Sequence, residues 1–178
     1  MGTQTSLDDD YHDLTFSVRR SIRYHTHRRS FYDRFNLFVN AFALIMGSAT
    51  VYGTLKEHWQ YLAIIAAMLV TIFSAINLVV GSSRQARLHH DLCKRFIDLE
   101  KKITACHDKN PDNLVLFISE RLDIEAEEPP VLHVLNSICH NELAKAMGYG
   151  EEHYAKITAL QRFFAHIIDI QEHKIKIA

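Results

Sequence analysis

The sequence is short of the residues that cross-link or interrupt a chain. Among its 178 residues are three cysteines, three prolines and six glycines. Cys93, Cys106 and Cys139 make an odd number without a close pair, and no N-x-S/T sequon occurs. These features indicate a reducing, cytosol-facing location and argue against an extracellular disulfide scaffold. No segment alternates polar and apolar residues as a half-buried strand does, so we predict an all-α fold.

Motifs of known chemistry are missing as well. No G-x-S-x-G, Walker or Rossmann pattern occurs, and Gly148-Tyr149-Gly150 alone does not indicate a phosphate site. His89, His90 and Cys93 share part of a helix face, but no second motif pairs with them, so a polar helix surface is the favoured interpretation. The net charge of -1 gives no reason to expect nucleic-acid binding. We expect no enzyme, no cofactor and no metal site.

Charged residues are absent from two long stretches, residues 35–55 and 58–83. At about 1.5 Å rise per helical residue, residues 35–55 cover roughly 30 Å, the thickness of a bilayer core, and so does the apolar part of the second stretch, residues 61–81. We therefore predict transmembrane helices over about 35–55 and 61–81. Two buried core helices of a soluble bundle are the less favoured alternative, because adjacent uncharged runs of this length are rare in small domains. The first thirty residues carry several aspartates and no apolar run, so we expect no secretory signal.

The loop between the predicted spans, residues 56–60, is too short to cross a bilayer, so the spans should form an antiparallel hairpin. Basic residues cluster outside the spans, whereas in the loop Lys56 is offset by Glu57. The positive-inside rule then places both termini in the cytoplasm. The expected parts are an N-terminal cytoplasmic helix, a hairpin and a cytoplasmic helical domain, over residues 1–34, 35–83 and 84–178. The arginines expected at the cytoplasmic mouth or at lipid headgroups are Arg28, Arg29, Arg34, Arg84 and Arg87.

Helical spacing continues on both sides of the hairpin. Before it, Tyr11, Leu14 and Val18 recur at helical intervals, which predicts one long helix entering the membrane, or two with a bend near Tyr24. After it, apolar residues three or four apart form a coiled-coil-like stripe with charged residues on the opposite face. This predicted oligomerisation seam consists of Leu88, Leu92, Phe96, Leu99 and Ile103.

Beyond the seam the sequence predicts three more helices. A short helix over about 112–123 follows a break at Pro111. Another helix runs from Pro129 to Gly148, since proline favours the start of a helix and glycine its end. The last helix begins at Glu151, where acidic residues suit a helix N-terminus. The side chains that it is expected to bury are Tyr154, Ile157, Leu160, Phe164 and Ile168.

Small and polar residues follow one face of each predicted span. Asn40 and Asn77 lie at similar predicted depth and are expected to hydrogen-bond across the hairpin, because an unpaired amide is costly in hydrocarbon. Either these faces pack within one hairpin, or one packs and the other lines a polar path between copies. Neither face has a charged residue, which argues against a proton relay or an ion-coupled transporter. The candidates for packing or pore lining are Asn36, Asn40, Ala43, Gly47, Thr50, Thr54, Thr71, Ser74 and Asn77.

A basic helix, a two-span hairpin with a minimal loop and a basic juxtamembrane segment follow one another in this chain. The segment reads Gly81-Ser82-Ser83-Arg84-Gln85-Ala86-Arg87-Leu88-His89-His90-Asp91-Leu92, followed by Arg95-Phe96 and Leu99-Glu100. Over about residues 15–178 this arrangement resembles the SLATT proteins, the SMODS and SLOG-associating two-transmembrane effector domain family. The resemblance rests on architecture and helix pattern.

The resemblance implies a multi-pass protein of the bacterial inner membrane that acts in antiphage defence by abortive infection. It implies homo-oligomers that contact membrane lipids and form pores. The trigger would be a separate sensor protein, a nucleotide second messenger or a phage component. The alternatives are a non-conducting, membrane-anchored helical adaptor and a small regulated ion channel. Subunit number, trigger and ion preference are not set by the sequence.

Overall fold

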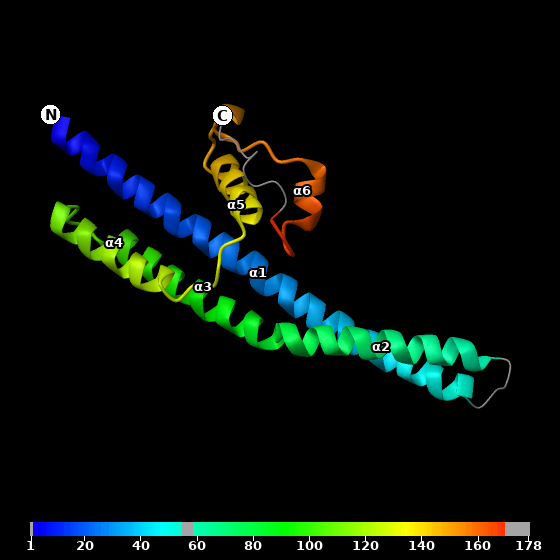
Figure 1. The fold of residues 1–178 in the computed structure, drawn as a ribbon. Helices are drawn as coiled ribbons and strands as arrows, with labels where there is room; N and C mark the ends of the chain where they lie inside the picture. The colour runs from blue at the N-terminus through cyan, green and yellow to red at the C-terminus, as the bar shows by residue number, and fades with distance from the viewer. Residues whose placement is uncertain (1, 55–58, 170–178) are drawn as a thin grey trace. The chain divides into compact units, whose positions relative to one another are not determined.

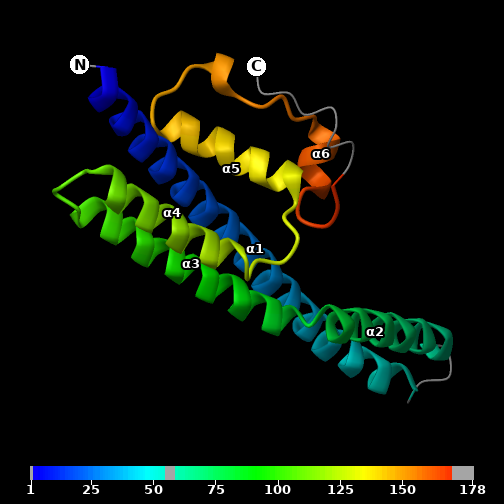
Figure 2. The ribbon, with the colours of Figure 1, turned by 60° about the vertical axis from the view of Figure 1, so that its left-hand side comes forward.

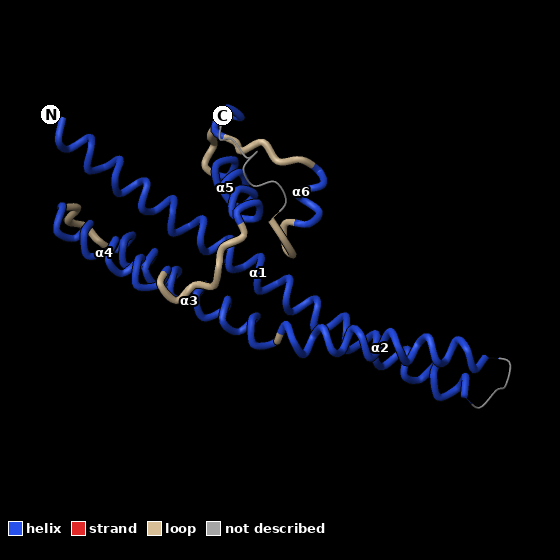
Figure 3. Tube along the Cα trace, in the orientation of Figure 1, coloured by secondary structure: helices blue, strands red, loops and turns tan. Residues whose placement is uncertain are grey.

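The structure is a computed structural model that describes residues 2–54 and 59–169, with side chains described for residues 6–50 and 59–169. Within these ranges it is all-helical, as predicted, and Figure 3 shows helices joined by loops without a strand. The chain divides into two compact units, a hairpin unit of residues 28–88 and a bundle unit of residues 1–27 with 89–178. The helices are α1 (Gly2–Thr54), α2 (Gln60–Val80), α3 (Ser82–Ala105), α4 (Pro111–Glu125), α5 (His133–Ala146), the 3-10 helix η2 (Glu151–His153) and α6 (Ala159–Phe164).

The hairpin unit contains the second part of α1 and the whole of α2, which lie side by side in both views of the ribbon (Figures 1 and 2). The α2 helix covers residues 60–80, close to the predicted second span. It ends at Gly81, whose φ of 62° is left-handed and whose N–H donates to the carbonyl of Asn77 at 3.0 Å. A glycine is favoured there because a side chain is strained at positive φ. Residues 55–58 of the predicted loop lie outside the described residues.

The bundle unit packs the first part of α1 with α3 and α4. Its α1 residues Tyr11, Leu14 and Val18 are buried, and the predicted spacing is confirmed by a helix that continues through Tyr24 without a break. Figures 1 and 2 show α4 running back along α3. Ion pairs at the edges join Arg19 to Glu100 at 2.6 Å and Lys102 to Glu120 at 2.7 Å. Exposed pairs of this kind each contribute up to about 1 kcal/mol, so apolar burial dominates the packing.

The α4 helix begins within one residue of its predicted start, whereas the α5 helix begins later than predicted. Pro111 does start α4, because Asn110 caps it by accepting a hydrogen bond from the Asn113 N–H at 2.8 Å. The α5 helix, however, begins at His133 and not at Pro129. Residues that precede a proline are restricted to extended conformations, so the Pro129-Pro130 pair delays the helix.

A distant carboxylate sets the start of α5. Asp169 accepts hydrogen bonds from the N–H groups of His133 and Val134, at 2.7 and 3.0 Å. The preceding N–H, that of Leu132, donates to the Tyr24 hydroxyl at 3.0 Å. These partners satisfy helix N-terminal donors that otherwise lack acceptors. The sequence near Pro129 does not show them, because both come from other parts of the chain.

The prediction of a last helix that begins at Glu151 is wrong. From this residue the chain forms one 3-10 turn, Glu151–His153, and α6 begins only at Ala159. The segment between them is kept from becoming helical by Asn141. Its side chain donates to the Ala155 carbonyl at 2.8 Å and accepts from the Ala155 N–H at 2.7 Å. Those are the groups that a continuous helix would use. Of the side chains expected to be buried by this helix, Leu160 and Ile168 are exposed.

Candidate functional site

The α2 helix exposes nearly all of its apolar side chains. Within it only Ala63 and Ala66 are buried. Leu78 and Val79 leave 82% and 87% of their surfaces exposed. Apolar surface is unfavourable in water by about 25 cal/mol per Å². Contiguous exposed patches therefore mark contacts with membranes or with other protein chains.

One helical stretch in the described residues, Gln60–Ala105, is long and apolar enough to cross a membrane. Its apolar part is α2, so the predicted second span corresponds to a helix of suitable length. The predicted first span over 35–55 is not found by the same criterion, and the side chains of residues 51–55 lie outside the described residues. The presence of a second span stays a prediction.

The two helices of the hairpin unit meet along one stripe of α2. Ala63 and Ala66 are buried toward α1, and further along the same face Phe73 packs edge-on against two aromatic rings of α1. Its ring centroid lies 6.0 Å from that of Phe38 and 5.3 Å from that of Phe42. Small residues at such a contact let helix backbones approach closely.

Asn77 pairs with Asn36 and not with Asn40, which corrects the expected hydrogen bond. Its Nδ2 donates to the Oδ1 of Asn36 at 3.0 Å, while Asn40 is exposed. The expected pairing counted depth from the predicted span ends. The contact of Phe73 with Phe38 and Phe42 instead sets a register that differs by one helical turn, and residues one turn apart share a face.

The other polar candidates have a mixed environment. The hydroxyls of Thr50 and Thr71 donate to the carbonyls four residues earlier in their own helices, at 2.8 and 2.9 Å. This bond satisfies a hydroxyl within its own helix, so these residues suit apolar surroundings without a partner across an interface. Half-buried candidates are Ala43, Gly47 and Thr50, exposed ones are Asn40, Thr71 and Ser74, and the side chain of Thr54 lies outside the described residues.

The arginines predicted for the membrane surface differ in their contacts. Arg28 is half-buried, hydrogen-bonds the Tyr32 hydroxyl and lies 4.7 Å from the centroid of that ring. Arg29 pairs with Asp33 at 3.5 Å, one helical turn away. Both contacts are local to α1. The arginines that are exposed are Arg29, Arg34, Arg84 and Arg87.

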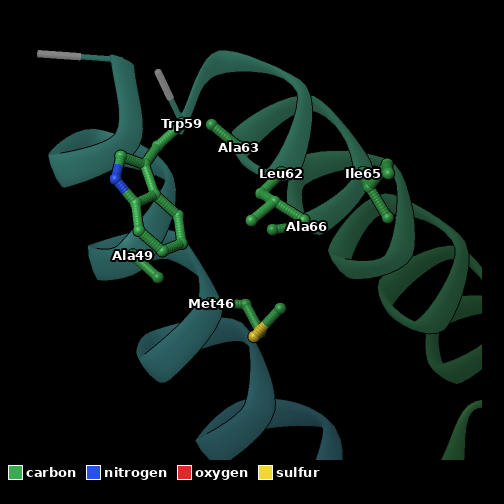
Figure 4. A pocket seen from close by; sticks show the side chains of 7 residues that line it. All are labelled: Met46, Ala49, Trp59, Leu62, Ala63, Ile65 and Ala66. Atoms are coloured by element: carbon green, nitrogen blue, oxygen red, sulfur yellow. The ribbon is translucent and has the colours of Figure 1, made fainter. Parts of the chain in front are cut away.

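An apolar groove between α1 and α2 was not expected from the sequence. It has a volume of about 400 Å³ and lies where Trp59 begins the second helix (Figure 4). The indole ring of Trp59 faces the groove, and the side chain of Met46 lies on the α1 side of it. The groove suits an acyl chain or an apolar side chain of another molecule. Its full lining is Met46, Ala49, Trp59, Leu62, Ala63, Ile65 and Ala66.

The predicted oligomerisation seam is buried within a single chain over most of its length. Leu92, Phe96 and Leu99 are at most 2% exposed, Ile103 is buried, and Leu88, which belongs to the hairpin unit, is half-buried. The chain itself therefore covers these side chains. Contact between copies through the seam stays a prediction, and it would require the bundle unit to open.

A buried polar network interrupts the apolar core of the bundle unit. His25 on α1 lies 2.9 Å from His89 on α3, Nδ1 to Nδ1, and both rings are buried. The His25 Nε2 lies 3.0 Å from an oxygen of Glu128, and Phe96 stacks on the His25 ring at 5.5 Å. One histidine donates and the other accepts between the two Nδ1 atoms. The network thus links α1, α3 and the segment after α4.

Sequence reasoning placed His89 on a polar helix surface together with His90 and Cys93, and that interpretation is wrong for His89. His90 is exposed, and the Cys93 thiol lies 3.5 Å from the Thr26 hydroxyl. The three side chains do not converge. The signal that was overlooked is spacing, because His89 lies three residues before Leu92, on the same apolar stripe.

Comparison with protein family models, with curated proteins and with solved structures finds no match to this chain.

Proposed function

We propose that this protein is a membrane-anchored effector whose hairpins from several copies assemble into a pore, as in the SLATT proteins that its architecture resembles. The observation that carries the proposal is the exposed apolar surface of α2. A helix that buries only Ala63 and Ala66 against its neighbour needs lipid or further copies of itself around the rest of its surface.

The polar side chains of the hairpin unit support assembly over simple anchoring. One hydrogen bond joins Asn77 to Asn36 inside the hairpin, whereas Asn40 and Ser74 are exposed. An exposed asparagine is costly in hydrocarbon. A contact with another copy, or a water-filled path between copies, removes that cost. A single hairpin cannot enclose a pore, so conduction requires several chains.

The test is ion flux through the purified full-length protein in liposomes. We expect the wild-type protein to release potassium and Asn40→Leu to release much less. Leu78→Ala, at an exposed apolar position, is the control and should conduct like the wild type. Protease protection confirms insertion of each variant. Inserted wild-type protein that gives no flux, with or without a cell extract from infected bacteria, would overturn the pore.

The span number needs a separate test. We infer two spans because residues 35–55 contain no charge and because the flanking arginines lie outside both stretches. Reporter fusions after residue 57 and at the C-terminus of the chain distinguish the topologies. Two spans place both termini on the cytoplasmic side and residue 57 outside. A single span over α2 places the two termini on opposite sides of the membrane.

A non-conducting adaptor is the second candidate, and one observation favours it. The α4 helix exposes three apolar side chains to solvent, which suit a docking protein. An adaptor should give no flux yet retain a soluble partner that is lost when two of these residues become serine. The three side chains are Val115, Leu116 and Leu122.

A further inference from the structure

We propose that the bundle unit binds a zinc-like divalent transition metal between α1, α5 and the turn after α6. The ligand atoms of His27, Cys139 and Glu142 all lie within 4.8 Å of one another. A fourth candidate ligand, the imidazole of His166, lies with its ring centroid 6.0 Å from that of His27. Neither the sequence patterns nor the proposed pore requires this site, so it stands independently of both.

The spacing of the three donor atoms approaches the spacing between the ligands of a zinc site. Bonds of about 2.3 Å to sulfur and 2.0–2.1 Å to nitrogen place zinc ligands roughly 3.3–3.7 Å from one another. The His27 Nε2 and the Glu142 Oε2 already lie 3.0 Å apart. Cys139 and Glu142 are three residues apart on α5 and therefore share a helix face. Small side-chain rotations suffice to bring three donors onto one ion.

The donor set and the surrounding charges select the kind of metal. One thiolate, one carboxylate and two imidazoles suit zinc and related transition metals, whereas calcium and magnesium prefer oxygen ligands. Lys145 and Arg162 line the same cavity and disfavour a cation held by charge alone. With a thiolate and a carboxylate bound, the two charges of a dication are neutralised at the site.

A path to the site exists from solvent. His27, Glu142 and His166 line an open cavity of about 440 Å³ in the bundle unit. Cys139 is buried next to them. Burial raises the pKa of the Cys139 thiol to about 12, so without metal the group is a neutral thiol. Metal binding then forms a metal–sulfur bond and releases the thiol proton to solvent, which makes the affinity rise with pH.

The other explanation of the cluster is a core cysteine beside an exposed ion pair. Cys139 packs with Val134, Leu135 and Ala165 in an apolar cluster, as unligated cysteines often do. That explanation accounts for the thiol. It gives no reason for three further donors of metal-ligand type to gather beside it, two of which, His27 and Glu142, are 115 residues apart in the sequence.

The experiment uses the full chain in detergent, stripped of metal with a chelator and titrated with Co²⁺. We expect one equivalent to produce the visible bands of tetrahedral cobalt and a near-ultraviolet thiolate-to-cobalt band. Zn²⁺ should displace the cobalt, and Mg²⁺ and Ca²⁺ should not. Cys139→Ala should remove the near-ultraviolet band, and Cys106→Ala should retain it.

Because Cys139 lies in the core, surface variants keep the test independent of folding. Glu142→Gln and His27→Gln should each weaken cobalt binding by at least about 10-fold, the loss seen when even an indirect partner of a metal ligand is removed. Glu151→Gln, an exposed acid outside the cluster, is the control and should leave binding unchanged. Absence of a thiolate band in the wild type, or equal binding by Glu142→Gln and Glu151→Gln, would overturn the site.

Discussion

The helices α2 and α3 follow one another in the sequence but differ in the burial of their apolar side chains. In the bundle unit, Phe96 of α3 is 0% exposed, whereas in the hairpin unit Leu78 of α2 is 82% exposed. Only Gly81 separates the two helices along the chain. The α3 helix has packing partners for its apolar stripe, while α2 is apolar over most of its surface and meets a partner along one stripe. Water therefore stabilises the first arrangement, and the second needs an apolar environment.

The largest expected effect comes from the core of the bundle unit. Phe96→Ala should lower the free energy of unfolding by about 3–5 kcal/mol, because it removes a fully buried ring and leaves a cavity. Leu78→Ala should change it by less than about 0.5 kcal/mol in detergent, since that side chain has no packing partner to lose. Urea unfolding followed by circular dichroism measures both. Equal losses would contradict the contrast between the two units.

The buried polar network gives the next largest effect. His25→Leu should destabilise the bundle unit by about 1–3 kcal/mol, because it leaves Glu128 and the Nδ1 of His89 without the imidazole that joins them. His107→Leu, at an exposed position between α3 and α4, is the matched control and should have little effect. The same unfolding measurement applies. A His25→Leu variant as stable as the control would show that the network contributes no stability.

Burial of Cys139 predicts a dependence on alkaline pH. Its pKa is raised to about 12 from an ordinary value of 9.0 because burial disfavours the thiolate. Between these values the unfolded chain loses the thiol proton while the folded chain keeps it. The contribution is therefore complete below about pH 9 and falls as the pH rises, by at most about 1.4 kcal/mol per pH unit.

We expect metal-free Cys139→Ala to lose less stability between pH 9 and 11 than metal-free wild type does. Cys106→Ala, which removes a half-buried thiol, serves as the control and should follow the wild type. Chemical unfolding at a series of pH values in chelator provides the comparison. Parallel curves for the wild type and Cys139→Ala would contradict the assignment.

The smallest effect concerns the hydrogen bond within the hairpin unit. Asn77→Leu should destabilise the hairpin by about 0.6 kcal/mol, a typical value for such a bond between membrane helices. Asn40→Leu, at an exposed position, should not destabilise it. Trp59 is the single tryptophan of the chain and lines the groove between α1 and α2, so its fluorescence during unfolding in SDS reports on this unit. A larger loss for Asn40→Leu would favour the register first expected.

Local patterns that the sequence carries in full were predicted well. Helix type, the extent of α2 and the start of α4 at Pro111 all depend on residues within a few positions of each other. The start of α5 was missed because Asp169 and Tyr24 supply its caps from elsewhere in the chain. The last helix was missed because Asn141 bonds the backbone of Ala155. Such contacts have no local signature.

The candidate sites divide in the same way. Absence of charge over 58–83 was enough to identify α2 as a helix suited to a membrane, because hydropathy is a property of composition. Composition did not identify the hydrogen-bond partner of Asn77. A shift of one helix along the other by one turn exchanges Asn40 for Asn36 without changing the composition of either helix. The sequence also assigned His89 to the surface, because a single helix does not show which neighbour covers its stripe.

By itself, the sequence determined that the chain is helical and where its uncharged helix lies. Backbone hydrogen bonds within a helix and the cost of exposing apolar surface are both local quantities. Only the tertiary structure decided which polar groups meet. The pairing of His25 with His89 and the gathering of His27, Cys139 and Glu142 depend on side chains brought together across more than 60 residues of sequence. Their register is set by packing, which no single helix encodes.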